Sequence, residues 1–219
     1  MPMDMLGLRP WTAAHFGMMF TMWAIMMVGM MLPSATPTTL VYAAVARKAD
    51  REGTPVAPAA IFVLGYLLMW TVFSLGATAA QWALEAAALL SPMMVSTSPA
   101  LGGALLIGAG VYQLTPMKDA CLEHCRSPAH FISAHWRPGS LGAFRMGIEH
   151  GAYCLGCCWI LMGLLFVGGV MNLLWIAAIT LYVLLEKVLP YGLGRGRFAG
   201  VAMIASGTWV LFLTGSGST

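Results

Sequence analysis

One histidine and three cysteines stand at helical spacing in the stretch MGIEHGAYCLGCCWILMG, which covers residues 146–163 and is otherwise apolar. They are His150, Cys154, Cys157 and Cys158. Positions i, i+4, i+7 and i+8 share one helix face, because each residue turns an α-helix by about 100°. Thiolates bind soft metals such as Cu(I) and Zn(II), and imidazole suits both copper and zinc. A lone cysteine on such a face is usually a small buried hydrophobe, but three cysteines with a histidine favour metal binding or thiol chemistry.

A second group of donors is the segment CLEHC, residues 121–125. If this segment is helical, Cys121 and Cys125 share a face and His124 lies beside them. The segment lacks the paired CxxC motifs of a zinc ribbon, so by itself it is the weaker signal. His130 and His135 follow it and are equally well explained as solvated loop residues.

Methionine is unusually frequent, with 18 residues in the chain and seven in HFGMMFTMWAIMMVGMML, residues 15–32. A helix over this stretch brings His15, Met18, Met19, Met22, Met26 and Met30 into one arc of about 120°. Neutral, weakly binding thioethers along such an arc could pass a soft monovalent cation from one residue to the next. Methionine is also a flexible filler of irregular packing, and the two interpretations stay open.

Three charged residues lie at the ends of apolar segments. Charged groups inside spans are expensive and are candidates for function, so Glu186 could balance a bound cation or accept a proton. The neighbouring Lys187 is expected to extend its ammonium group to the membrane surface. Glu85 is expected in the outer interface.

The amino-acid composition indicates the kind of fold that positions these donors. Of the 219 residues, 59% are hydrophobic and 9% are charged, whereas soluble domains carry about 25% charged residues. The sequence therefore predicts an integral membrane protein of the all-α class: a polytopic helix bundle forming a single transmembrane domain over residues 1–219. A spanning helix needs about 20 apolar residues. Six segments qualify: 12–32, 59–81, 99–116, 147–169, 172–189 and 198–214, with a Cys/His loop at 117–146. No basic nucleic-acid surface or phosphate loop is visible.

The distribution of basic residues predicts the orientation. Ten of the eleven Lys and Arg residues fall in or beside the first, third and fifth connections. By the positive-inside rule these connections are cytoplasmic, so both termini are expected outside and the Cys/His loop inside. Structural disulfides are rare in that reducing compartment. The short link at 168–172 predicts a tight hairpin, with Asn172 capping the helix that follows.

Four strings carry a resemblance to a known family: MWAIMMVGMMLPSA, YQLTPMKDACLEHCRSP, GIEHGAYCLGCCW and GGVMNLLWIA with LEKVLP. They resemble a bacterial family described as predicted metal-binding integral membrane proteins, a domain of unknown function loosely associated with copper. The resemblance covers nearly the whole chain and implies location in the bacterial inner (plasma) membrane. The residues that it highlights are Met26, Met27, Met30, Met31, Cys121, Cys125, Cys154, Cys157, Cys158 and Glu186.

We therefore expect a membrane protein that binds a soft metal, Cu(I) first and zinc as the alternative, for copper handling, delivery or translocation. The expected metal ligands are Cys154, Cys157, Cys158, His150, Cys121, Cys125, His124, Met26 and Met30. Glu186 would balance charge, and His15, Met19 and Met22 would form a metal path.

Two other interpretations remain. In the first, the chain is an enzyme or an enzyme subunit. It would then be a thiol–disulfide oxidoreductase that uses the CxxC pair Cys154 and Cys157, or a subunit of a membrane copper oxidase or monooxygenase. In the second, it is a non-catalytic assembly subunit of a homo- or hetero-oligomer, because its small-residue segments allow close helix contacts.

Overall fold

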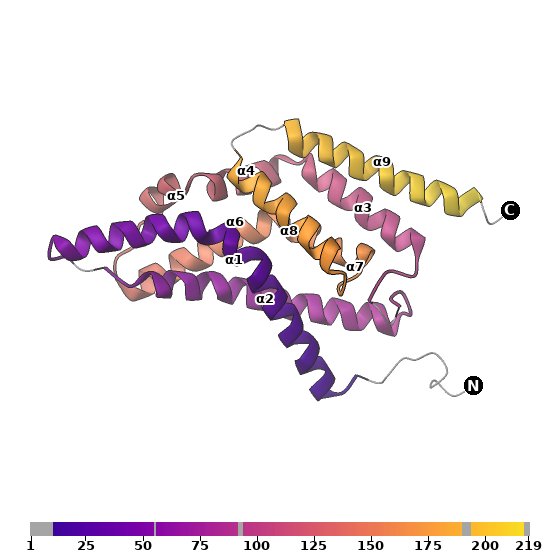
Figure 1. The fold of residues 1–219 in the computed structure, drawn as a ribbon, viewed down its shortest axis with the longest axis horizontal. Helices are drawn as coiled ribbons and strands as arrows, with labels where there is room; N and C mark the ends of the chain where they lie inside the picture. Colours follow the sequence, from indigo (N-terminus) through magenta and orange to yellow (C-terminus); the bar gives the residue numbers. More distant parts are fainter. Residues whose placement is uncertain (1–10, 55, 92–93, 190–193, 217–219) are drawn as a thin grey trace.

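The computed structural model describes residues 11–54, 56–91, 94–189 and 194–216, and in these ranges the chain is almost entirely helical (Figure 1). The helices are α1 (Ala13–Arg51), α2 (Ala59–Ala86), α3 (Pro99–Gln113), α4 (Pro116–Arg126), α5 (Pro128–Ala134), α6 (Gly139–Gly163), α7 (Leu165–Gly168), α8 (Leu173–Val188) and α9 (Gly194–Ser216). The described ranges contain one isolated β-bridge, between Leu90 and Ser96, and no longer strand. The predicted all-α class is confirmed.

Four stretches of helix are long and apolar enough to cross a membrane: α1, α2, α6 together with α7, and residues 196–213 of α9. The pair α3 and α4 is bent by 66° at its break and would make a fifth span if counted as one. Helix α8 has 16 residues and falls below this length. The six-span arrangement and the external termini therefore stay predictions.

Helix α1 is longer than expected, because it runs through the segment LPSATP that was expected to end the first span. Pro33 and Pro37 both lie inside it, and the helix changes direction midway (Figure 1). Each proline removes one backbone hydrogen bond, and hydroxyl groups supply others nearby: Ser34 Oγ and Tyr66 OH both donate to the carbonyl of Met31, at 2.8 and 2.9 Å. Such hydroxyls are the usual reason that apolar helices tolerate proline.

Glycines set the two closest helix pairs. A Cβ added at Gly147 of α6 would collide with the backbone of α2 at Phe62, and one added at Gly65 would collide with α6. Helices α3 and α9 meet in the same way through Gly103 and Gly207. Small residues permit this close approach, so the glycine-rich face of α3 is covered by α9 within the same chain.

The connection before α8 is a tight turn, as the sequence predicts. Gly169 has φ +94°, a value that glycine adopts without strain. Asn172 accepts a hydrogen bond from Trp175 N at 3.2 Å, which confirms the predicted cap of α8.

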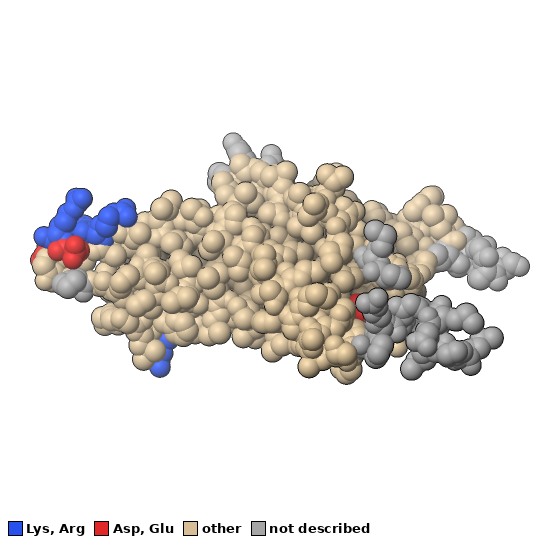
Figure 2. Space-filling view, turned by 60° about the horizontal axis from the view of Figure 1, so that its bottom comes forward, with Lys and Arg blue, Asp and Glu red and all other residues tan. Residues whose placement is uncertain are grey.

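The surface separates charged from apolar residues. Figure 2 shows a broad face without charged side chains and a cluster of Lys, Arg, Asp and Glu at one end, over the turn between α1 and α2. Leu174 of α8 is 84% exposed and Phe198 of α9 is 78% exposed. An apolar exterior of this extent is typical of surfaces that contact lipid or a partner protein.

A buried cluster of thiols and thioethers

The thiols of α6 lie together in the interior. Cys154, Cys157 and Cys158 are each at most 2% exposed and belong to one contiguous hydrophobic core. The thiols of Cys157 and Cys158 both donate to the carbonyl of Cys154, at 3.0 Å. The predicted cysteine stripe is therefore the inner face of α6.

Helix α4 adds the remaining cysteines. Cys125 is buried in the same core and interacts with the thiols of Cys154 and Cys157. Cys121 lies one turn away and is partly buried, with its Sγ against the backbone of α6: a Cβ built at Gly156 would be 2.8 Å from it. All five cysteines are free thiols. The 66° bend between α3 and α4 directs α4 across α6 and brings the two cysteine motifs together.

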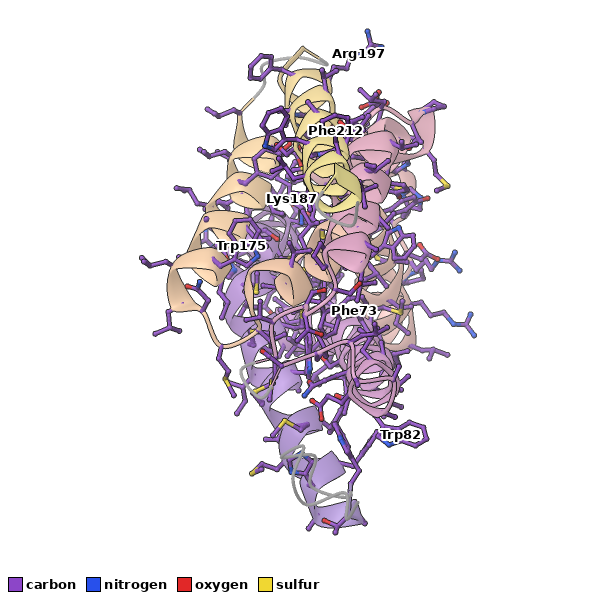
Figure 3. All side chains as sticks on the ribbon, turned by 90° about the vertical axis from the view of Figure 1, so that its right-hand side faces the viewer. Phe73, Trp82, Trp175, Lys187, Arg197 and Phe212 are labelled. Atoms are coloured by element: carbon purple, nitrogen blue, oxygen red, sulfur yellow. The ribbon has the colours of Figure 1, made fainter. Side chains whose placement is uncertain are left out.

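A lysine occupies the edge of this cluster. Lys187 of α8 places its Nζ 2.9 Å from Cys154 Sγ and 3.0 Å from Ser34 Oγ, and Figure 3 shows it within the bundle. This contradicts the expectation that Lys187 reaches the membrane surface. The reason is its position on α8, where Ile179, Val183 and Lys187 recur every four residues on the buried face.

Tyr66 of α2 completes the surroundings of Cys154. Its hydroxyl lies 3.1 Å from Cys154 Sγ while it donates to the carbonyl of Met31. Cys154 thus contacts groups from α2 and α8, and Lys187 brings a positive charge next to its sulfur.

Glu186 belongs to a separate network. Lys118 Nζ donates to both carboxylate oxygens at 2.8 Å, and Tyr182 OH donates to one of them at 2.7 Å. Lys118 is 2% exposed, so this is a buried ion pair. The charge of Glu186 is therefore compensated by Lys118, and it is Lys187 that lies beside the thiols.

His150 lies one turn before Cys154 and is 2% exposed. Its ring packs among Phe62, Tyr66 and Phe131, with centroid distances of 5.9, 5.8 and 5.1 Å. Its Nδ1 is buried without a hydrogen-bond partner. A buried nitrogen with a free lone pair or proton is uncommon and leaves this imidazole available as a ligand.

The methionines of α1 face two directions. Met27, Met30 and Met31 are buried in the same core as the thiols. Met22, Met26 and Met30 line a groove beside α8 together with Met171, and the groove has a cavity volume of about 540 Å³. Thioethers therefore extend from the groove to the buried core.

The other predicted residues lie apart from this cluster or at its margin. His124 stacks on Tyr153 with a centroid distance of 4.1 Å, and its Nδ1 is 2.9 Å from the carbonyl of Ala120. His15 packs edge-on against Trp11 near the start of α1. Met19 is buried near the same end of the helix and contacts Gln81.

The donors are close but are not aligned on one point. Within the described ranges, no three His, Cys, Asp or Glu side chains have the geometry to hold a metal ion. The thiols of Cys157 and Cys158 turn instead toward the Cys154 carbonyl. Rotation about χ1 between staggered positions redirects a cysteine sulfur without moving the backbone. The donor set itself, thiols with thioethers in an apolar interior, fits a soft ion such as Cu(I).

Fold and site together define an α-helical protein with several helices apolar enough for a membrane and a core rich in soft metal donors. A family model described as "PpoB2: Copper chaperone" matches residues 20–210, and the chain belongs to this family. The match includes all five cysteines, His150 and the methionines from Met22 to Met31. No curated protein and no solved structure matches the chain. The predicted association with copper is thus confirmed at the level of the family.

Proposed function

We propose that this chain is a membrane-embedded copper chaperone that binds Cu(I) between the cysteines of α4 and α6. One observation carries the proposal: Cys125, Cys154, Cys157 and Cys158 share a single buried core with Met27 and Met30. Two separate helices, α4 and α6, have to pack against each other to bring these sulfur atoms together. Hydrophobic packing alone does not require that so many side chains at one crossing carry sulfur.

The softness of the donor atoms that the structure describes near Cys154, and the absence of a free carboxylate among them, favour Cu(I) over Zn(II). Thiolates bind both ions. The usual ligands of zinc are Cys, His and carboxylates, whereas the thioethers in this core suit Cu(I). The nearby carboxylate, Glu186, is held by Lys118. The available donors near Cys154 are therefore sulfur atoms and the imidazole of His150.

Lys187 gives the site its charge balance. Cu(I) bound by two thiolates carries one net negative charge, and burying an unpaired charge is costly. The ammonium group of Lys187 lies 2.9 Å from Cys154 Sγ, so the complex of metal, two thiolates and lysine is neutral. The sequence suggested that Glu186 would balance the charge of the metal site. In this proposal the neighbouring residue of opposite charge, Lys187, does so.

In this proposal, two hollows beside the cluster give access to the site. On one side is the methionine-lined groove between α1 and the start of α8. On the other is a polar pocket of about 630 Å³, which includes Lys187 together with Asp119, Glu123 and Arg126. In this proposal copper moves between the groove and the pocket through the thiols, and the methionines of α1 form the weaker-binding part of the route.

The principal alternative is a thiol–disulfide oxidoreductase that uses Cys154 and Cys157. The contact between Lys187 and Cys154 favours it, because reactive cysteines lie next to cationic groups. In this alternative the protein cycles between dithiol and disulfide and needs no metal.

Copper binding by the purified full-length chain tests the proposal. The reduced protein in mild detergent is titrated with Cu(I) against a chromogenic chelator, beside the variant Cys154→Ser/Cys157→Ser. A matched control is Ser133→Ala, because Ser133 of α5 is exposed and the change leaves all the thiols in place. The proposal expects bound copper in the wild type and in the control, and its loss from the double variant.

The alternatives predict other results. A wild type that binds no copper but shows a redox-dependent shift in electrophoretic mobility identifies the thiol oxidoreductase. A wild type with neither property shows that the cysteines serve only in packing.

A further inference from the structure

A second group of soft donors lies at the other end of α1, far from the cysteines. Gln81 of α2 is completely buried. Its Nε2 lies 3.6 Å from Met19 Sδ, 3.4 Å from Met94 Sδ and 2.8 Å from Glu85 Oε1. Two thioethers and a carboxylate from α1, α2 and the α2–α3 connection therefore converge on one nitrogen atom.

Two indole groups hold this arrangement in place. Trp23 Nε1 donates to Gln81 Oε1 at 2.7 Å. An indole N–H can only donate, so the oxygen of the amide must face Trp23 and the nitrogen must face the thioethers. Trp11 Nε1 donates to the second carboxylate oxygen of Glu85 at 2.8 Å. Both acceptor groups are therefore oriented by neighbours.

Within the part of the chain that the structure describes, the carboxylate of this cluster has no cationic partner. Glu85 is half-buried, and none of the ion pairs among the described residues includes it. Its partners, Gln81 and Trp11, are neutral donors. A half-buried carboxylate is partly removed from water, and a monovalent cation at this point would offset its charge.

We propose that Met19, Met94 and Glu85 form a second Cu(I) site, and that the amide of Gln81 occupies its centre when the site is empty. This inference rests on the proposed copper function and extends it. Two neutral thioethers with one carboxylate make a neutral complex with Cu(I), and they bind it more weakly than thiolates do. The site therefore suits loading or release rather than storage.

Methionines of α1 lie between the two proposed copper sites. Met19 and Met30 are separated by eleven residues, which is about 16 Å along a helix. Met22 and Met26 lie between them and line the groove beside α8. Figure 3 marks this end of α2 with Trp82 and the other region with Lys187. The two sites thus stand at opposite ends of one row of thioethers.

The test uses Ag(I), a soft monovalent probe that is stable in air, and the full-length chain in detergent. The variants are Met94→Leu and Glu85→Gln, and the matched control is Met18→Leu, since Met18 lies on the same turn of α1 but is 57% exposed. Equilibrium dialysis is expected to show one Ag(I) fewer per chain in each variant and no change in the control. Cys154→Ser/Cys157→Ser is expected to lose a different equivalent and to keep this one.

A second measurement on the wild type keeps the test valid if a variant does not fold. In protein labelled with ¹³C at the methionine methyl groups, Ag(I) is expected to shift the signals of Met19 and Met94 and to leave Met18 unchanged. Unshifted signals, or variants that bind as much Ag(I) as the wild type, would overturn the second site and leave the thiol site standing. A wild type that binds no Ag(I) at all rejects the proposed function itself.

Discussion

Two buried lysines differ in the partners that surround them. Lys118 forms an ion pair with both oxygens of Glu186, so its charge is matched by a fixed carboxylate. Lys187 directly follows Glu186 on α8. It contacts the sulfur of Cys154 and the hydroxyl of Ser34, and neither group carries a permanent charge. The first lysine completes a structural network, whereas the second leaves a positive charge to be matched when the thiols become anionic metal ligands.

The largest effect on stability is expected from Lys118→Met. The change leaves the carboxylate of Glu186 buried beside neutral partners, and breaking a buried ion pair on one side costs about 3 to 5 kcal/mol. Chemical denaturation in mild detergent, followed by circular dichroism, measures the loss. The double variant Lys118→Met/Glu186→Gln is expected to recover much of it, and equal losses in both variants would show that the ion pair is not the cause.

Replacing Lys187 by Met is expected to affect copper more than the fold. Without the ammonium group the complex of Cu(I) with two thiolates is a buried anion, and the affinity is expected to fall by at least about tenfold, equivalent to about 1.4 kcal/mol. Competition with a Cu(I) chelator measures the affinity, and Lys48→Met is the control because the Lys48 side chain is 78% exposed. An affinity equal to that of the wild type would falsify the role of Lys187 in charge balance.

The smallest of these effects is expected from Tyr66→Phe. It removes one hydrogen bond to the Met31 carbonyl and one contact with Cys154, which is expected to cost about 0.5 to 1.5 kcal/mol of stability. Copper affinity is expected to change less than in Lys187→Met. Tyr42→Phe is the matched control, because Tyr42 also donates to a carbonyl, that of Ala57, at 3.0 Å. If only Tyr66→Phe changes copper affinity, its hydroxyl acts on the thiols directly; if it abolishes binding, Tyr66 and not Lys187 is the main partner of Cys154.

Helical periodicity predicted the parts of the site that depend on one helix. The spacing of Cys154, Cys157 and Cys158 defines a face, and that face is the buried one. The same holds for the cap at Asn172. These features are local, because the identities of residues within two or three turns determine them.

Features that depend on how helices are rotated against each other could not be predicted in this way. Lys118 and Glu186 are 68 positions apart, and no local pattern relates them. The side chain of Lys187 points inward because its face of α8 is the buried one. Met94 lies in the connection between α2 and α3, and helical periodicity does not predict the path of a connection. The continuation of α1 through Pro33 and Pro37 is accompanied by a hydrogen bond from Tyr66 of another helix to the Met31 carbonyl, and no local pattern predicts that contact.

That continuation has a consequence for the reach of the molecule. A straight helix of 39 residues measures about 58 Å, whereas the hydrocarbon core of a bilayer is about 30 Å thick. In the proposed membrane setting α1 is therefore longer than one crossing requires. Its two halves run in different directions on either side of the prolines (Figure 1), and the second half packs through Tyr42 against Phe62 of α2 and Phe131 of α5.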